Sequence, residues 1–287
     1  MLHLLPSLES LVITFLTDDD APYLSESLES ELLQSAVLGG LACNPNPLSA
    51  LQSLHIHTWL ALCDDLYSEA FFKRIFESLR DLRFNVQRTD VNSNDDSLAA
   101  PLTVHHFWRH VIGPRVLQPA VNLTSLAMGS TICFGALICL DWGSITFPFL
   151  ASLSLSNFIW EYSRPDRVDP SEVTLQAEDF IVRHERTLKQ LELYSCVISI
   201  PTNRPTAVRP WTAVWNRFSK ELTELVDLDV HYGFHLQYVQ HEDGYRFSSA
   251  YAVPGTEQDL PALEAFHTIV TTRRLLTYST GDGDSGV

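Results

Sequence analysis

Leucines recur along this chain in one spacing, Leu-x-x-Leu-x-apolar, and this pattern restricts the fold more than any other feature. In an extended segment the second leucine and the apolar residue two positions later point to the same side, and their neighbours point to the other. The first leucine turns inward just before the strand. Each copy therefore predicts a short strand with one buried face. Seven copies stand next to turn or helix signals, and they begin at Leu8, Leu51, Leu79, Leu123, Leu150, Leu188 and Leu225.

Between these strands, apolar residues recur at helical spacing. Alternating strand and helix, in units too small to bury their own faces, is typical of leucine-rich repeats. The copies start at unequal intervals, so we expect an α/β fold of one kind: an irregular leucine-rich-repeat-like solenoid, with a parallel sheet lined by helices. The helical groups are residues 23–38; Phe72, Ile75, Phe76 and Leu79; Phe107, Trp108, Val111 and Ile112; Ala177, Phe180 and Ile181; and Trp211, Val214, Trp215, Phe218 and Leu222.

LKQLELYSCVI, residues 188–198, is the best copy, because it fits the longer pattern LxxLxLxxCxI. In that pattern the cysteine lies in the turn after the strand and satisfies backbone groups there. From His231 onward the pattern changes to a hairpin around Asp243-Gly244 and a closing helix over 260–273. We therefore expect the solenoid over residues 1–230, a C-terminal hairpin and helix cap over 231–278, and a disordered tail over 279–287.

The net charge of the chain indicates which classes of partner it can bind. Lys and Arg number 19 and Asp and Glu number 35, which gives a net charge of −16, and no Lys or Arg precedes Lys73. A field of this sign repels phosphate backbones and anionic lipid. We therefore expect no nucleic acid and no membrane surface as partner, and a protein target with a basic segment instead. A solvated acidic face that only aids solubility is the alternative.

Targeting signals and cysteines indicate the compartment. The N-terminal stretch lacks the positive flank of a signal peptide, and the longest membrane-like run, 132–140, is too short to span a bilayer. The five cysteines form no CxxC pair, which is typical of a reducing compartment. We expect an intracellular protein, cytoplasmic or nuclear.

Five sequence blocks follow one another in the second half of the chain: FPFLASLSLSNF, AEDFIVRHERTLKQLELYSCVI, WTAVWNRFSKELTELVDLDV, YVQHEDGY and ALEAFHTIVTTR. In this order they resemble the leucine-rich C-terminal region of fungal F-box proteins. The likeness covers residues 120–275 well, and residues 1–120 only through the repeat pattern.

The resemblance implies the substrate-recognition half of an SCF-type ubiquitin ligase, in which an F-box docks the Skp adaptor and the repeats hold the target. An F-box occupies about 40 to 50 residues ahead of the repeats. Here the first predicted strand begins by Leu8, so we expect the F-box itself to be absent and a Skp-type adaptor to bind only if an F-box exists upstream. The alternative is a free-standing leucine-rich-repeat scaffold or interaction protein with no ligase role. Both functions are non-enzymatic.

The outward positions of the predicted strands should line one surface, the concave face of the solenoid. Solenoids commonly bind partners on such a surface. We expect the acidic and aromatic end of it to hold a basic segment. Solvent-facing strand residues without a partner are the alternative for any single position. The candidate binding residues are His55, His57, Arg83, Ser154, Glu192, Tyr194, Asp227 and Asp229.

Other constellations indicate no catalytic, cofactor or metal site. His55 and His57 alternate on a predicted strand but lack a third ligand at convincing spacing. His106 and His110 are one helical turn apart, but a zincin requires a Glu after the first His, where Phe107 stands. The tryptophans at 211 and 215 are predicted to be core. The terminal GDSG has no matching catalytic histidine motif. We therefore expect no enzyme and no cofactor.

Overall fold

Seven strands form a parallel sheet in the computed structural model. The model describes residues 7–15, 24–42, 50–62, 65–68, 70–87, 104–130, 140–160, 174–200, 209–231, 237–242, 246–248 and 256–281. The strand order is β1-β2-β3-β4-β5-β7-β9. Each strand coincides with one copy of the leucine pattern, so the predicted α/β class with a parallel sheet is confirmed. The strands are β1 (Ser10–Ile13), β2 (Ser53–Leu60), β3 (Asp81–Gln87), β4 (Ser125–Ser130), β5 (Ser152–Ser156), β7 (Gln190–Tyr194) and β9 (Asp227–His231).

The chain divides into two compact units. Unit 1 comprises residues 1–149 and 243–246, and unit 2 comprises residues 150–242 and 247–287. The sequence predicted a boundary between a solenoid over 1–230 and a cap over 231–278. The two compact units do not test that boundary, which stays a prediction. Within the expected disordered tail, residues 279–281 belong to the last helix, and residues 282–287 lie outside the described part of the chain.

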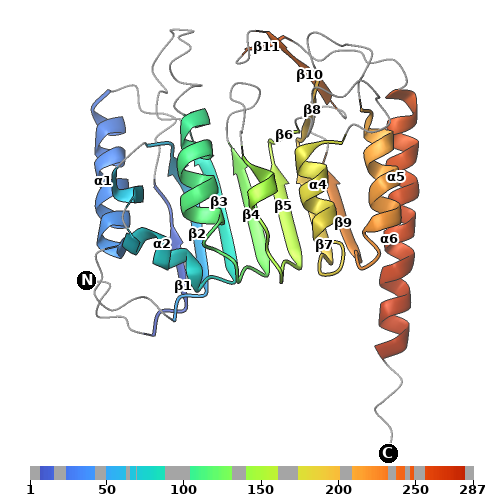
Figure 1. The fold of residues 1–287 in the computed structure, drawn as a ribbon, viewed down its shortest axis with the longest axis horizontal. Helices are drawn as coiled ribbons and strands as arrows, with labels where there is room; N and C mark the ends of the chain where they lie inside the picture. The colour runs from blue at the N-terminus through green and yellow to red at the C-terminus, as the bar shows by residue number, and fades with distance from the viewer. Residues whose placement is uncertain are drawn as a thin grey trace, which may run out of the picture. The chain divides into compact units, whose positions relative to one another are not determined.

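In unit 1 the helices lie on one side of strands β1 to β4 (Figure 1). They are α1 (Leu24–Ala42), the short η2 (Asp65–Ser68), α2 (Ala70–Glu77) and the π-helix η3 (Trp108–Leu117), with the single turn η4 (Trp142–Ser144) further along. The core between sheet and helices is aromatic: the Trp59 ring contacts Phe76, Phe84 and Phe107 at centroid distances of 5.5 to 6.5 Å. The expected helical groups at 72–79 and 107–112 supply Phe76 and Phe107, and strands β2 and β3 supply Trp59 and Phe84.

In unit 2 the helices α4 (Gln176–Arg183) and α5 (Trp211–Glu221) cover one face of β5, β7 and β9, and α6 (Asp259–Gly281) packs on α5 (Figure 1). Trp211 and Trp215 are buried, as predicted, and Trp160 is buried against Trp211. The buried Asp259 carboxylate accepts hydrogen bonds from the Thr212 backbone N–H at 2.7 Å and from the Tyr238 hydroxyl at 2.6 Å. Asp259, the first residue of α6, therefore caps the N-terminal end of α5.

A second, smaller sheet, with the strand order β11-β10-β8-β6, was not expected. Its strands are β6 (Ile159–Trp160), β8 (Val197–Ile200), β10 (Gln237–Glu242) and β11 (Arg246–Ser248), and the single turn η6 (Thr256–Gln258) leads into α6. The expected hairpin strands are present as β10 and β11, but β10 also pairs with β8 in parallel. Its turn lies outside the described residues.

The same backbone contact recurs wherever consecutive strands of a unit begin. The carbonyl oxygen of the second residue of one leucine motif accepts two backbone N–H bonds from the next motif. Gln52 and Ser53 donate to Glu9, at 2.8 and 3.0 Å, and Lys189 and Gln190 donate to Ala151, at 2.8 and 2.9 Å. The carbonyls that act in this way are those of Glu9, Gln52 and Arg80 in unit 1, and of Ala151 and Lys189 in unit 2.

The turn after the strand also recurs in unit 2. Asn157 after β5 and Ser195 after β7 both have positive φ, 59° and 49°. The Cys196 thiol, in the turn after β7, lies 3.5 Å from the Leu155 carbonyl oxygen of β5 and 3.7 Å from that of Tyr194 at the end of β7. It therefore donates to backbone groups, as the pattern predicted, but these groups belong to the strands and not to the turn. Burial raises the pKa of Cys196 to about 12, which keeps it a neutral donor.

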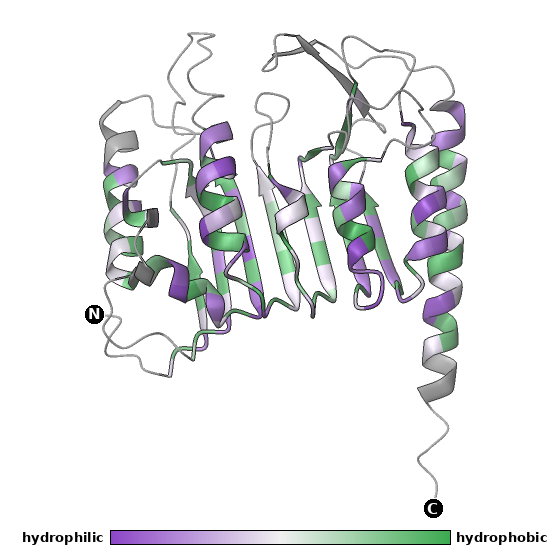
Figure 2. Ribbon diagram, in the orientation of Figure 1, coloured by the Kyte–Doolittle hydropathy of each residue, from purple (hydrophilic) through white to green (hydrophobic). Residues whose placement is uncertain are grey.

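Hydropathy alternates along the strands, as Figure 2 shows for both units. In β7 the residues alternate between exposed and buried from Gln190 to Tyr194. The first leucines of six motifs, from Leu51 to Leu225, are fully buried. None of the helices in the described ranges is both long enough and apolar enough to cross a bilayer.

Two neighbouring substitutions test this alternation. Leu191 in β7 is 1% exposed, whereas Gln190 beside it is exposed. Leu191→Asp should lower the free energy of unfolding by more than about 4 kcal/mol, because it leaves a cavity and buries an unpaired carboxylate. Gln190→Asn, which adds no charge opposite its strand partner Asp227, should change it by less than about 0.5 kcal/mol. Urea unfolding followed by circular dichroism measures both, and equal losses would contradict the assigned faces.

Candidate functional site

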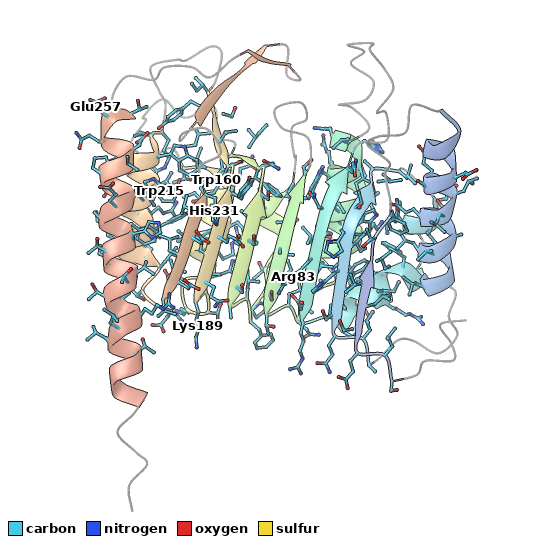
Figure 3. The ribbon with its side chains drawn as sticks, turned by 180° about the vertical axis from the view of Figure 1, so that it is seen from behind. Arg83, Trp160, Lys189, Trp215, His231 and Glu257 are labelled. Atoms are coloured by element: carbon cyan, nitrogen blue, oxygen red, sulfur yellow. The ribbon has the colours of Figure 1, made fainter. Side chains whose placement is uncertain are left out.

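The candidate site is the face of the parallel sheet that the helices leave uncovered, called here the open face. Figure 3 views the chain from this side and labels Arg83 in unit 1 and His231 in unit 2. The strand pairing places the outward residues in rows. In unit 1, His55 pairs with Arg83, and in unit 2 Ser154, Glu192 and Asp229 form one row.

In unit 1 the open face carries a closed hydrogen-bond network around Asp81. Its Oδ2 lies 2.6 Å from His55 Nε2 and accepts from Ser53 Oγ at 3.1 Å. Its Oδ1 accepts from Arg83 Nε at 3.3 Å. Burial alone would raise the pKa of Asp81, but the hydrogen bonds from His55 and Ser125 and the charge of Arg83 lower it below its ordinary value.

This Ser, His and Asp combination is not a catalytic triad. In a triad the serine and the aspartate bind opposite nitrogens of the imidazole, so that one nitrogen takes the serine proton and the other is held by the carboxylate. Here Ser53 Oγ, at 3.2 Å, and the Asp81 carboxylate both face His55 Nε2. The network therefore balances the negative charge of Asp81 and holds its carboxylate in one orientation. His57 on the same strand is exposed, next to the irregular pairing between Ile56 and Trp59.

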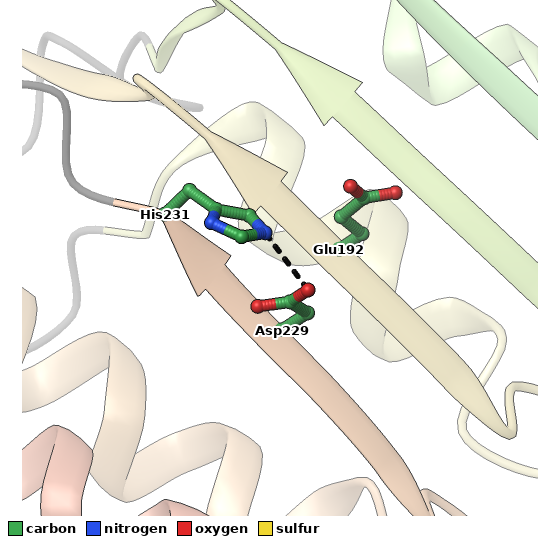
Figure 4. Close-up of side chains that lie close together, drawn as sticks. All are labelled: Glu192, Asp229 and His231. Carbon is green, nitrogen blue, oxygen red and sulfur yellow. Dashed lines mark hydrogen bonds and ion pairs between the residues drawn. The ribbon is translucent and has the colours of Figure 1, made fainter.

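In unit 2 the open face carries a more exposed group on β7 and β9, shown in Figure 4. His231 Nε2 lies 2.8 Å from Asp229 Oδ2, and Glu192 lies opposite Asp229 on the neighbouring strand. One ligand atom from each of these three residues lies within 4.8 Å of the other two. The Tyr194 ring, 45% exposed, stands 5.8 Å from the His231 ring, centroid to centroid.

The remaining candidate residues frame this group. Asp227 begins β9 and lies 3.6 Å from Arg274 Nη1 of α6, in an exposed ion pair. Such a pair contributes little to stability. Ser154 on β5 is partly exposed in the row of Glu192 and Asp229. In unit 2 the structure therefore brings together the acidic and aromatic residues that the sequence singled out, and their role in binding stays a prediction.

Sequence reasoning missed the convergence of His231 with Glu192 and Asp229. The two strands start 37 residues apart in sequence, from Gln190 to Asp227, and the proximity depends on their register. Aligning the two leucine motifs would have placed Glu192 opposite Asp229. His106 and His110, in contrast, were recognised as neighbours, and their exposed rings lie 4.2 Å apart, centroid to centroid.

The comparisons with known proteins give no family assignment. No protein-family model matches the chain, and a search of curated proteins also finds no match.

The Asp81 network predicts a pH dependence. The folded-state pKa of Asp81 is lower than its ordinary 3.8, so its ionised form stabilises the fold above that pH, and the contribution disappears as pH falls through the lowered value. Asp81→Asn should therefore be less stable than the parent chain near neutral pH, and the difference should shrink below the ordinary carboxyl pKa. Thermal unfolding at a series of pH values measures it. A difference that does not vary with pH would contradict the network.

Proposed function

We propose that this chain is an irregular leucine-rich-repeat solenoid that binds a protein partner through the open face of its sheet. The observation that supports this most is the exposed group of Glu192, Tyr194 and Asp229, on the face that none of the described helices of unit 2 covers. The solenoid part of the proposal is supported by the recurrent backbone contact at the second residue of the leucine motif. Such repetition is what stacked, equivalent units produce.

Charge complementarity favours a basic segment as the occupant. In unit 2 the open face presents the carboxylates of Glu192, Asp227 and Asp229, and the chain as a whole carries −16. Tyr194 offers an exposed ring beside them, which can hold a guanidinium or ammonium group over its face. An aromatic anchor flanked by carboxylates is a common composition of an interface hot spot that recognises arginine or lysine.

The class of partner follows from the resemblance to the repeat region of fungal F-box proteins. On that basis we propose that the bound protein is a target for ubiquitination, and that this chain supplies the recognition half of an SCF-type ligase. A Skp-type adaptor joins only if an F-box exists upstream of this chain. A free-standing scaffold uses the same open face without that adaptor. No catalytic step by this chain is required in either case.

Charge reversal tests the open face. The double variant Glu192→Lys with Asp229→Lys should weaken binding of a fluorescein-labelled arginine–serine repeat peptide at least about tenfold, or about 1.4 kcal/mol, at physiological salt. The matched control is Glu185→Lys with Glu224→Lys, which changes net charge equally at acids in the turns after α4 and α5. Fluorescence anisotropy measures the affinity. Equal losses in both variants, or no binding by the parent chain, would contradict the proposal.

Co-purification tests the ligase role. Affinity purification of the gene product from cells that express it should recover the Skp adaptor and a cullin together with the target. The same experiment with Glu192→Lys and Asp229→Lys should retain Skp and lose the target, because the two are held by different parts of the protein. Recovery of the target without Skp or cullin would instead identify a free-standing scaffold.

A further inference from the structure

We propose that Glu192, Asp229 and His231 form a binding site for a divalent transition-metal ion, with Zn²⁺ as the foremost candidate. This goes beyond protein binding, although the same strands carry both. The three side chains offer two carboxylates and one imidazole, and their ligand atoms lie within 4.8 Å of one another. The imidazole separates this group from an ordinary acidic patch, because imidazole nitrogen is a preferred zinc ligand.

The distances suit a zinc ion after small side-chain adjustments. Zinc binds nitrogen and carboxylate oxygen at about 2.0 to 2.2 Å, so two ligands of a tetrahedral site stand about 3.4 Å apart. His231 Nε2 and Asp229 Oδ2 are 2.8 Å apart and must separate slightly, and the other ligand atoms, within 4.8 Å, must approach by up to about 1.4 Å. Both carboxylate side chains are exposed, so rotation about their side-chain bonds can supply these adjustments.

The backbone holds the three positions in place. Glu192 and Asp229 are direct partners in the parallel pairing of β7 and β9, and Tyr194 and His231 are partners two residues further on. The Tyr194 ring stands beside the His231 ring and restricts where the imidazole can point. The ligands therefore converge from two adjacent strands, which is a more rigid support than a loop.

The ligand set also predicts selectivity. One imidazole with two carboxylates favours Zn²⁺ and its transition-metal neighbours over Mg²⁺ and Ca²⁺, which prefer oxygen ligands alone. Three protein ligands leave one tetrahedral position open, and water or a side chain of a bound protein can fill it. On an exposed face, that open position suits a bridge to a partner.

The chain contains its own matched control. His55 and Asp81 in unit 1 form a similar pair on the open face, with Nε2 and Oδ2 2.6 Å apart. The neighbour of this pair is the Arg83 guanidinium, 3.3 Å from Asp81, whereas the neighbour of the pair in unit 2 is the Glu192 carboxylate. A cation at that position repels a metal ion, so this second pair should not bind one.

Isothermal titration calorimetry of the purified full chain with zinc chloride tests the site. The parent chain should show saturable zinc binding and none for magnesium chloride. His231→Ala and Glu192→Gln should each weaken zinc binding at least about tenfold, as expected when a ligand is removed. His55→Ala should leave it unchanged. Circular dichroism should show that all variants remain folded, because the substituted residues lie on the open face.

A rival ligand set makes the test decisive. His106 and His110, exposed and adjacent on one helix, are a second pair of imidazoles that a zinc ion could share. Binding that survives His231→Ala but is lost in His110→Ala would overturn the proposal, as would the absence of saturable binding. Repeating the peptide measurement with a chelator keeps the two proposals separate. Peptide binding without zinc supports the open face as a binding surface even if no metal binds. Saturable zinc binding without peptide binding supports the metal site alone.

Discussion

The rest of the structure depends on the register in which the strands of each unit pair. Because side chains alternate along a strand, a slip of one residue would move every leucine to the open face and every polar residue to the core. The repeated bonds to the second residue of each motif, at Glu9, Gln52 and Ala151 among others, fix that register before the strand begins. One backbone contact thus decides both the buried layer and the rows of the open face.

The carboxylates of the open face have charged partners in unit 1 and are more exposed in unit 2, and the proposed function rests on this difference. In unit 1, His55 and Arg83 compensate Asp81, and the lowered pKa of that carboxyl expresses the compensation. Among the described residues of unit 2, no Lys or Arg side chain lies beside Glu192, and the hydrogen-bond partner of Asp229 is the His231 imidazole. A carboxylate that already accepts hydrogen bonds from charged side chains gains little free energy from binding an external cation. An exposed carboxylate beside an aromatic ring can still bind one.

Periodicity predicted the seven strands and their outward residues because that information is local: each motif states which side chains alternate. It did not predict β6 and β8, because Val197 to Ile200 are all buried and show no alternation. It also missed the Asp259 cap on α5, which joins residues 47 positions apart, and the meeting of His231 with Glu192. These contacts depend on how distant segments dock, which no short window of sequence records.

Behind the open face, a buried charge network orients the helices of unit 2. Glu178 on α4 is fully buried and is bound by Arg209 at 2.5 Å and by Arg217 of α5 at 3.2 Å. Leaving that carboxylate unpaired would be costly, so the network favours one alignment of α4 and α5. Leucines thus fix the strands and buried paired charges orient the helices, and neither role uses Glu192, Tyr194 or Asp229. Those positions are therefore free to change with the partner while the fold stays the same.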